Sequence, residues 1–183
     1  AQDGTFWVSD EYGPHIVHYS AEGVELERIS PIGVNTGNRK LPAVFAKRRP
    51  NRGMEGMCIT PDGKTLVGTM QSTMYVPTKA LATNTTLTRI VTFDIATGQT
   101  KQFLYKQDGG ASDSVCEITA ISNTEFLVIE RDGKFGSQGG LKKVYRINLS
   151  GASDVSGTDL TAVDGLKING KTLEQSTWAE ISA

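Results

Sequence analysis

A short pattern that occurs three times is the feature that most constrains the fold of this chain. Each copy is a pair of turn-forming residues followed by an apolar strand that ends in a polar residue. The copies lie at residues 3–10 (DGTFWVSD), 62–69 (DGKTLVGT) and 123–130 (NTEFLVIE). They begin roughly sixty residues apart, and self-similarity at a regular period is the sequence signature of a repeat architecture. We therefore expect copies of one structural unit.

The residues around each copy repeat as well. A short apolar strand opened by a glutamate precedes the second and third copies, at residues 55–60 and 117–122. After each copy comes a strand with alternating apolar positions, then a turn, and after the first two turns a candidate outer strand. These further strands are expected at residues 16–19, 24–29, 90–93, 99–105 and 144–147. Alternation between short turns is typical of half-buried antiparallel strands.

Four antiparallel strands in each unit predict an all-β fold, a β-propeller of four-stranded blades with about three blades present. The blades are expected at residues 1–30, 54–106 and 115–157, and the start of a further blade at 158–183. Because the first unit lacks its innermost strand and a propeller closes with about four blades or more, we expect an incomplete domain. The remaining blades of the same protein would then be its partners. A stand-alone β-sandwich is the alternative.

Composition limits the other partners. The net charge of −1 gives no electrostatic case for binding nucleic acid or an anionic membrane surface. The longest apolar runs fall short of the roughly 18 residues that a membrane span needs. The only cysteines, Cys58 and Cys116, lie in apolar strand-like runs. They fit either one disulfide or two buried thiols.

Four motifs follow one another along most of the chain. They are residues 6–14 (FWVSDEYGP), 51–57 (NRGMEGM), 126–133 (FLVIERDG) and 143–147 (KVYRI). In this order they resemble the phytase-like domains described as "esterase-like activity of phytase". The resemblance implies a secreted or periplasmic propeller that acts as a hydrolase on phosphate or carboxylate esters.

The repeat also predicts where a site would lie. In a propeller the ends of the inner strands, and the loops that follow them, converge on one mouth of a central channel. The alignment makes Glu55 equivalent to Glu117, and Asp10 equivalent to Glu130. The residues expected at this mouth are Glu55, Glu117 and Glu130 as catalytic groups, Arg52, Arg131 and Tyr12 as substrate-binding groups, and Asp10, Glu11 and Asp132 as metal ligands.

These residue types suit two kinds of chemistry. Carboxylates can hold Ca²⁺, which takes six to eight oxygen ligands, or can polarise a water for attack on an ester. Arginine grips phosphate or carboxylate in a bidentate manner. A small anionic substrate such as a phosphate ester is therefore expected, with Ca²⁺ as a candidate cofactor. The arrangement resembles that of the calcium-dependent β-propeller phytases, although their acidic motifs are not recognisable here.

Three other readings stay open. The carboxylates could cap turns or pair with a neighbouring arginine, and so serve structure alone. The domain could be a binding propeller that presents its loops without catalysis, or a metalloenzyme similar to sugar lactonases. A serine esterase of the α/β-hydrolase kind is not favoured, because the chain has no Gly-x-Ser-x-Gly motif.

Overall fold

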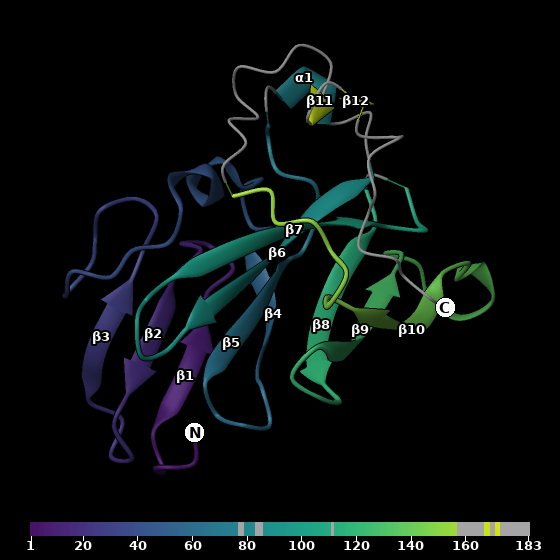
Figure 1. Ribbon diagram of the computed structural model, residues 1–183. Helices are drawn as coiled ribbons and strands as arrows, with labels where there is room; N and C mark the ends of the chain where they lie inside the picture. The colour runs from purple at the N-terminus through teal and green to yellow at the C-terminus, as the bar shows by residue number, and fades with distance from the viewer. Residues whose placement is uncertain (77–78, 83–85, 111, 157–166, 169–170, 173–183) are drawn as a thin grey trace.

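The computed structural model describes residues 1–76, 79–82, 86–110, 112–156, 167–168 and 171–172 (Figure 1). Three antiparallel sheets make up most of this part. The first sheet contains β1 (Phe6–Ser9), β2 (Ile16–Tyr19) and β3 (Glu25–Ile29); the middle sheet contains β4 (Met54–Ile59), β5 (Thr65–Met70), β6 (Leu87–Asp94) and β7 (Thr100–Lys106); the third sheet contains β8 (Ser114–Ala120), β9 (Glu125–Arg131) and β10 (Lys142–Asn148). The short elements are η1 (Ala43–Lys47), α1 (Lys79–Ala82), η2 (Gly136–Gln138), β11 (Lys167–Ile168) and β12 (Lys171–Thr172).

The structure confirms the all-β class. Strands form at each of the places where the alternating pattern predicts them, and consecutive strands within a sheet are hydrogen-bonded neighbours. The described residues do not close into a ring, so the propeller remains a prediction. The further blade expected at residues 158–183 lies outside the described residues, apart from the two-residue strands β11 and β12.

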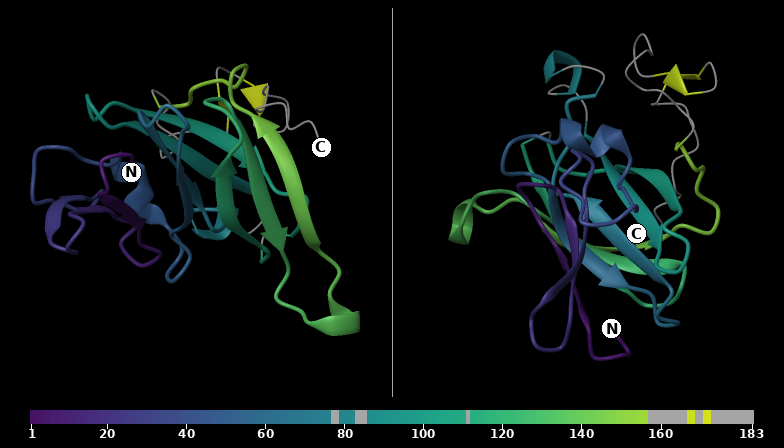
Figure 2. Two further views of the ribbon diagram at one scale, coloured as in Figure 1. Left: turned by 90° about the horizontal axis from the view of Figure 1, so that it is seen from below. Right: turned by 90° about the vertical axis from the view of Figure 1, so that its left-hand side faces the viewer.

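The middle sheet lies between the first and third sheets (Figure 2). It packs against both of them because its side chains alternate between two faces. One face contributes Leu66, Met70, Val91 and Phe93 to a core shared with Ile16 and Ile29 of the first sheet. The opposite face contributes Val67, Ile90, Phe103 and Tyr105 to a core shared with Val115, Phe126 and Val128 of the third sheet. Neighbouring residues such as Leu66 and Val67 thus stabilise different interfaces, and the three sheets pack face to face.

The segment between β3 and β4 fastens the first sheet to the middle one. Phe45 of η1 is fully buried in the core that these two sheets share. Arg39 forms an ion pair with Glu27 on β3 and donates to the carbonyl oxygen of Ile95 beyond β6. A loop of this length is therefore a packed part of the fold.

The two outer flanks of the stack expose apolar side chains. On the first sheet, Phe6 and Val8 are 54% and 47% exposed, whereas Trp7 between them packs into the core. On the third sheet, Ile129 and Val144 are register partners and both are exposed. Both flanks therefore have the character of sheet faces that another layer can cover.

The cysteines are two free thiols, half-buried on β4 and β8. Burial raises the pKa of the Cys58 thiol to about 12. In the part of the chain that the structure describes, no helix is long and apolar enough to cross a membrane.

The middle and third sheets meet most closely where β4 passes β8. A Cβ atom added to Gly56 would lie 2.8 Å from the Cα atom of Glu117 and 2.8 Å from the backbone nitrogen of Ile118. Both of these are backbone atoms, which cannot move aside as a flexible side chain would. Glycine is therefore required at this crossing for reasons of space alone.

Substitution of this glycine tests the crossing. Gly56→Ala is expected to lower the free energy of unfolding by about 1–3 kcal/mol, because the methyl group forces β4 and β8 apart. Urea unfolding measures the change. Gly151→Ala is the control, since an added Cβ there meets nothing within 4 Å; equal losses in the two variants would contradict the close approach.

Candidate functional site

A β-bulge interrupts the first strand of both the middle and the third sheet. Between β4 and β5 the register steps from Met54–Met70 to Gly56–Thr69, which leaves Glu55 as the extra residue. Between β8 and β9 it steps from Val115–Glu130 to Glu117–Ile129, which leaves Cys116 as the extra residue. A bulge re-aims the side chain of the residue that it leaves out, and bulges are common beside active sites.

These registers correct the alignment of the repeat. Glu55 corresponds to Cys116, whereas Glu117 takes the place of Gly56. The predicted equivalence of Glu55 and Glu117 is therefore wrong, because matching apolar runs cannot tell which residue leaves the ladder. Glu117 is exposed, and its carboxylate accepts a hydrogen bond from the backbone nitrogen of Ile118 at 2.8 Å.

The same registers reveal a repeated pair of contacts at the strand ends. Met70 and Glu130 occupy the same rung of their sheets, so the residues that follow them, Gln71 and Arg131, are equivalent. The Gln71 side chain lies beside the Glu55 carboxylate and opposes the rise in its pKa. The Arg131 side chain lies beside the Cys116 thiol and opposes the rise in the pKa of that thiol. In each sheet, the side chain at the end of the second strand thus lies next to the bulged residue of the first.

Backbone hydrogen bonds lock these two pairs together. The backbone nitrogen of Gln71 donates to the Gly53 carbonyl at 2.7 Å, and the Gln71 carbonyl accepts from the nitrogen of Val115 at 2.8 Å. Gln71 therefore joins the start of β4 to the start of β8. We call the group formed by Glu11, Arg52, Glu55, Gln71, Cys116 and Arg131 the Glu55 cluster.

Glu55 itself is in an unfavourable position for a charged carboxylate. Its Oε2 atom is buried, and no hydrogen-bond donor among the described residues reaches it. Burial raises the pKa of Glu55, and the neighbouring Glu11 carboxylate raises it further; the nearby side chains of Gln71, Arg131 and Arg52 only partly oppose this. A carboxyl group whose pKa is raised in this way can take up and release a proton nearer neutral pH.

Arg52 carries positive charge to the same place. Its guanidinium donates to the carbonyl oxygens of Ser112 at 2.9 Å and Asp113 at 3.3 Å. Burial lowers its pKa, and the neighbouring Arg49 and Arg131 lower it further. Two guanidinium groups, those of Arg52 and Arg131, therefore lie close enough to affect each other and Glu55, which favours an anion between them.

The structure places Glu130 outside this cluster. Its side chain is only 1% exposed, and it accepts hydrogen bonds from the Tyr105 hydroxyl, from the backbone nitrogen of Asp108 at 3.0 Å and from that of Gly109 at 3.3 Å. Both carboxylate oxygens are thus used to hold the turn after β7 against β9. This turn leads to the Ser112 and Asp113 carbonyls that Arg52 binds, so Glu130 supports the cluster from a distance.

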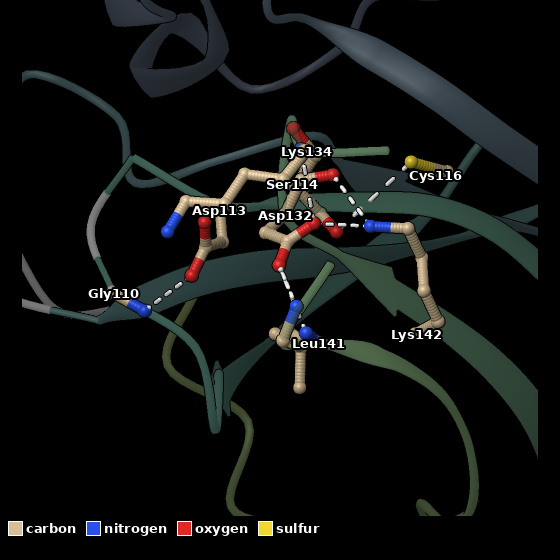
Figure 3. Close-up of polar contacts among 9 residues, drawn as sticks. Gly110, Asp113, Ser114, Cys116, Asp132, Lys134, Leu141 and Lys142 are labelled. Atoms are coloured by element: carbon tan, nitrogen blue, oxygen red, sulfur yellow. Dashed lines mark hydrogen bonds and ion pairs between the residues drawn. The ribbon is translucent and has the colours of Figure 1, made fainter. Parts of the chain in front are cut away.

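Asp132 closes the loop between β9 and β10 (Figure 3). Its carboxylate accepts from the backbone nitrogens of Lys134 at 3.0 Å, Gly140 at 2.6 Å and Leu141 at 2.9 Å. It also forms an ion pair with Lys142, which is the main reason that its pKa lies well below the usual range. These donors already occupy the oxygens that a metal ion would need.

The loop between β1 and β2 contains the other predicted residues. Asp10 accepts from the backbone nitrogen of Tyr12 at 2.8 Å, as Asp132 does from Lys134, so Asp10 corresponds to Asp132 and its predicted match with Glu130 is wrong. Glu11 follows, and its carbonyl oxygen would lie 2.0 Å from a Cβ atom at Gly53. That glycine lets the loop approach β4 and brings Glu11 to the cluster. Tyr12 is 66% exposed beside it.

The described residues do not fit a calcium site. No group of three histidine, cysteine, aspartate or glutamate side chains lies within reach of one ion in the described part of the chain. The predicted ligands Asp10 and Asp132 are instead engaged with the backbone of their own loops. Calcium binding by this chain therefore stays an untested prediction.

Two residues of the Glu55 cluster, Gln71 and Cys116, were not predicted from the sequence. Gln71 follows a buried strand. Cys116 lies directly before Glu117, which the repeat alignment matched with Glu55 instead. The bulges identify both residues. Cys116 is the extra residue in the β8–β9 ladder, and Gln71 directly follows Met70, which pairs with Met54 beside the bulge of the β4–β5 ladder. One sequence signal points to Gln71. It follows the second strand of its unit, and Arg131 stands at the end of the equivalent strand in the third unit.

Repeated antiparallel sheets with a charged cluster at their strand ends define an all-β repeat protein with a candidate site at a sheet junction. More particularly, the chain belongs to the phytase-like family described as "esterase-like activity of phytase", whose family model matches residues 1–181. An uncharacterized secreted protein of Arthroderma benhamiae is 28% identical over 170 residues. That match covers 73% of this chain and 33% of the relative, so the chain spans about a third of the relative's length.

The buried position of Glu130 predicts a large effect on stability. Glu130→Ala is expected to lower the free energy of unfolding by about 2–3 kcal/mol, since it leaves buried donors without an acceptor. Hydrogen exchange at the amides of Asp108 and Gly109 should accelerate. The control is Glu125→Ala on the same strand, which removes an exposed ion pair with Arg146 and should cost under about 1 kcal/mol. Unchanged exchange would contradict the supporting role.

The raised pKa of Glu55 predicts that its replacement stabilises the fold, whereas replacement of Glu130 destabilises it. A carboxyl group with a raised pKa in the folded state weakens the fold as pH rises from the ordinary glutamate range through the folded value. Glu55→Gln should therefore melt at a higher temperature than the wild type near pH 7, with no gain at about pH 4 and below. Glu22→Gln is the control, because a hydrogen bond with Ser20 lowers the pKa of that exposed residue.

Proposed function

We propose that this chain is part of a secreted β-propeller that hydrolyses phosphate or other esters at the Glu55 cluster. One observation carries the proposal. The Oε2 atom of Glu55 is buried without a donor, its pKa is raised, and the side chains of Arg52 and Arg131 lie close enough to oppose that rise. Such a carboxylate is costly for the fold, and groups whose pKa values are shifted by burial and by neighbouring charges occur often at functional sites.

Three observations support the propeller. The sheets are repeats that stack through their faces, and both outer flanks expose apolar side chains. The relative is about three times longer than the match. Further blades of the same protein would cover Phe6 and Val8 on one flank and Ile129 and Val144 on the other. The predicted secreted or periplasmic location is supported by the secreted relative and by the family.

In the proposed reaction, Glu55 acts as a general base. Its unpartnered Oε2 atom accepts a proton from a water molecule as the water oxygen attacks the phosphorus or the carbonyl carbon of the ester. The bond to the leaving oxygen then breaks, and protonated Glu55 returns the proton to that oxygen. A base whose pKa is raised toward the working pH performs both steps well.

The arginines serve the anionic part of the substrate. Arg131 lies beside Glu55 and Cys116, where its guanidinium can bind phosphate or carboxylate oxygens and offset the charge that develops on them. Arg52 is partly engaged with the Ser112 and Asp113 carbonyls, so it contributes charge from a fixed position. Glu11 adds to the rise in the pKa of Glu55 that burial causes. Tyr12 is exposed on the same loop, where it can contact the leaving group.

Binding without turnover is the second candidate. It is favoured by the hydrogen bonds of Arg52, which show that this arginine already has a structural duty. A metalloenzyme similar to sugar lactonases is less favoured, since the described residues bring together no three metal-binding side chains.

A substrate panel tests the proposal. The purified protein would be given p-nitrophenyl phosphate, phytate, p-nitrophenyl acetate and a γ-lactone. We expect turnover of a phosphate or carboxylate ester, a loss of about 100-fold or more in Glu55→Gln, and a raised KM in Arg131→Gln. Glu22→Gln should retain full activity.

Three outcomes would count against this function. Full activity in Glu55→Gln would reject the assignment of the base. Anion binding that depends on Arg131, with no turnover of any substrate, would favour the binding propeller. Turnover of the lactone alone, abolished by a chelator and restored by Ca²⁺, would favour the metalloenzyme.

A further inference from the structure

An open groove lies between the middle and third sheets, at the opposite strand ends from the Glu55 cluster. Its volume is about 760 Å³, which is within the range of small-molecule binding sites. Thr65, the first residue of β5, lines it, whereas Gln71 of the cluster follows the last residue of β5. The two places are therefore separated by the length of a six-residue strand, about 20 Å.

The floor of the groove is apolar. Val67 and Phe103 contribute to it from the middle sheet, and Phe126 and Leu149 from the third sheet. All four side chains belong to the core that these two sheets share. The floor is thus rigid, and because Val67 and Phe126 are 0% and 1% exposed and Phe103 and Leu149 6% and 8%, the contacts for a ligand come mainly from the polar groups around it.

The walls offer hydrogen-bonding groups that the protein does not use itself. Thr92, Thr100 and Thr124 line the groove, and within the described residues their hydroxyl groups have no hydrogen-bond partner. The side-chain amide of Gln99 is equally uncommitted. Hydroxyls and amides can both donate and accept, so this wall suits a ligand with many hydroxyl groups.

Two aspartates stand at the groove with one oxygen held and the other uncommitted. The Oδ1 atom of Asp94 accepts from the backbone nitrogen of Thr97 at 2.7 Å and from its hydroxyl at 2.8 Å. The Oδ1 atom of Asp154 accepts from the backbone nitrogens of Gln102 at 3.1 Å and Ser156 at 2.9 Å. No donor among the described residues reaches either Oδ2 atom. Both carboxylates are thereby pre-oriented acceptors, which reduces the entropy that a ligand must overcome.

The charges at the groove select the ligand further. Asp94 and Asp154 repel an anion, whereas Lys64 beside Asp94 and Lys101 beside Asp154 balance part of their charge. A phosphate ester is therefore disfavoured here, and a neutral molecule whose hydroxyl groups donate to the carboxylates is favoured. We propose that this groove binds a neutral oligosaccharide, whose sugar hydroxyls contact Asp94, Asp154 and the threonine hydroxyls that line the groove.

Isosteric substitutions give a sharp test. Asp94→Asn and Asp154→Asn retain an oxygen for the anchoring hydrogen bonds and replace the uncommitted oxygen by an NH₂ group. Asp62→Asn is the matched control, since Asp62 holds Thr60 and Lys64 in the same way outside the groove. Calorimetric titration would use the hexasaccharides of cellulose, laminarin, amylose and chitin. We expect at least one to bind, the affinity to fall tenfold or more in each groove variant, and Asp62→Asn to bind as the wild type does.

The outcomes separate this site from the Glu55 cluster. Lack of binding by every hexasaccharide, or equal affinity in wild type and both groove variants, would overturn the proposal. Competition by inorganic phosphate would assign the sugar to the Glu55 cluster instead, and would also overturn it. Melting temperatures of the variants, compared with Asp62→Asn, identify any loss that comes from unfolding. Since the two sites are independent, sugar binding stands or falls without regard to ester turnover.

Discussion

At Gly56, strand β4 passes so close to β8 that a hydrogen atom is all the side chain the crossing admits. This contact sets the distance between the middle and third sheets along their first strands. It also brings the two bulged residues, Glu55 and Cys116, to neighbouring positions. The hydrogen bond from Val115 to the Gln71 carbonyl can form only at this separation. The charged cluster is thus a consequence of a steric requirement in the backbone.

The cluster works against the stability of the fold. A buried carboxylate oxygen without a donor costs about 1–3 kcal/mol, and the nearby side chains of Gln71, Arg131 and Arg52 offset only part of the rise in the pKa of Glu55. The apolar interfaces on both faces of the middle sheet supply the compensation. Glu130 and Asp132 belong to that supporting structure, because their oxygens hold loops in place. Carboxylates of similar appearance in the sequence therefore perform opposite tasks.

Local pattern was sufficient to predict much of the fold. The strands follow from alternation of apolar residues, and the stacking follows from their repetition, as Leu66 and Val67 illustrate. The position of Glu55 at a shared strand end, near Arg52 and Arg131, could also be predicted from the repeat. The bulges could not, because the residue that leaves a ladder depends on the register of a partner strand. The structural role of Glu130 could not be predicted either, since its hydrogen-bond partner Tyr105 lies in another sheet.

In the proposed function, Glu55 is a proton-carrying group in an anion-binding cluster. A ¹³C NMR titration of glutamate side-chain carboxyls tests this directly, with the Glu55 signal assigned by Glu55→Gln, in the absence and presence of inorganic phosphate. We expect a Glu55 pKa above the ordinary glutamate range and a further rise when phosphate binds beside it. An ordinary pKa that phosphate leaves unchanged would contradict it.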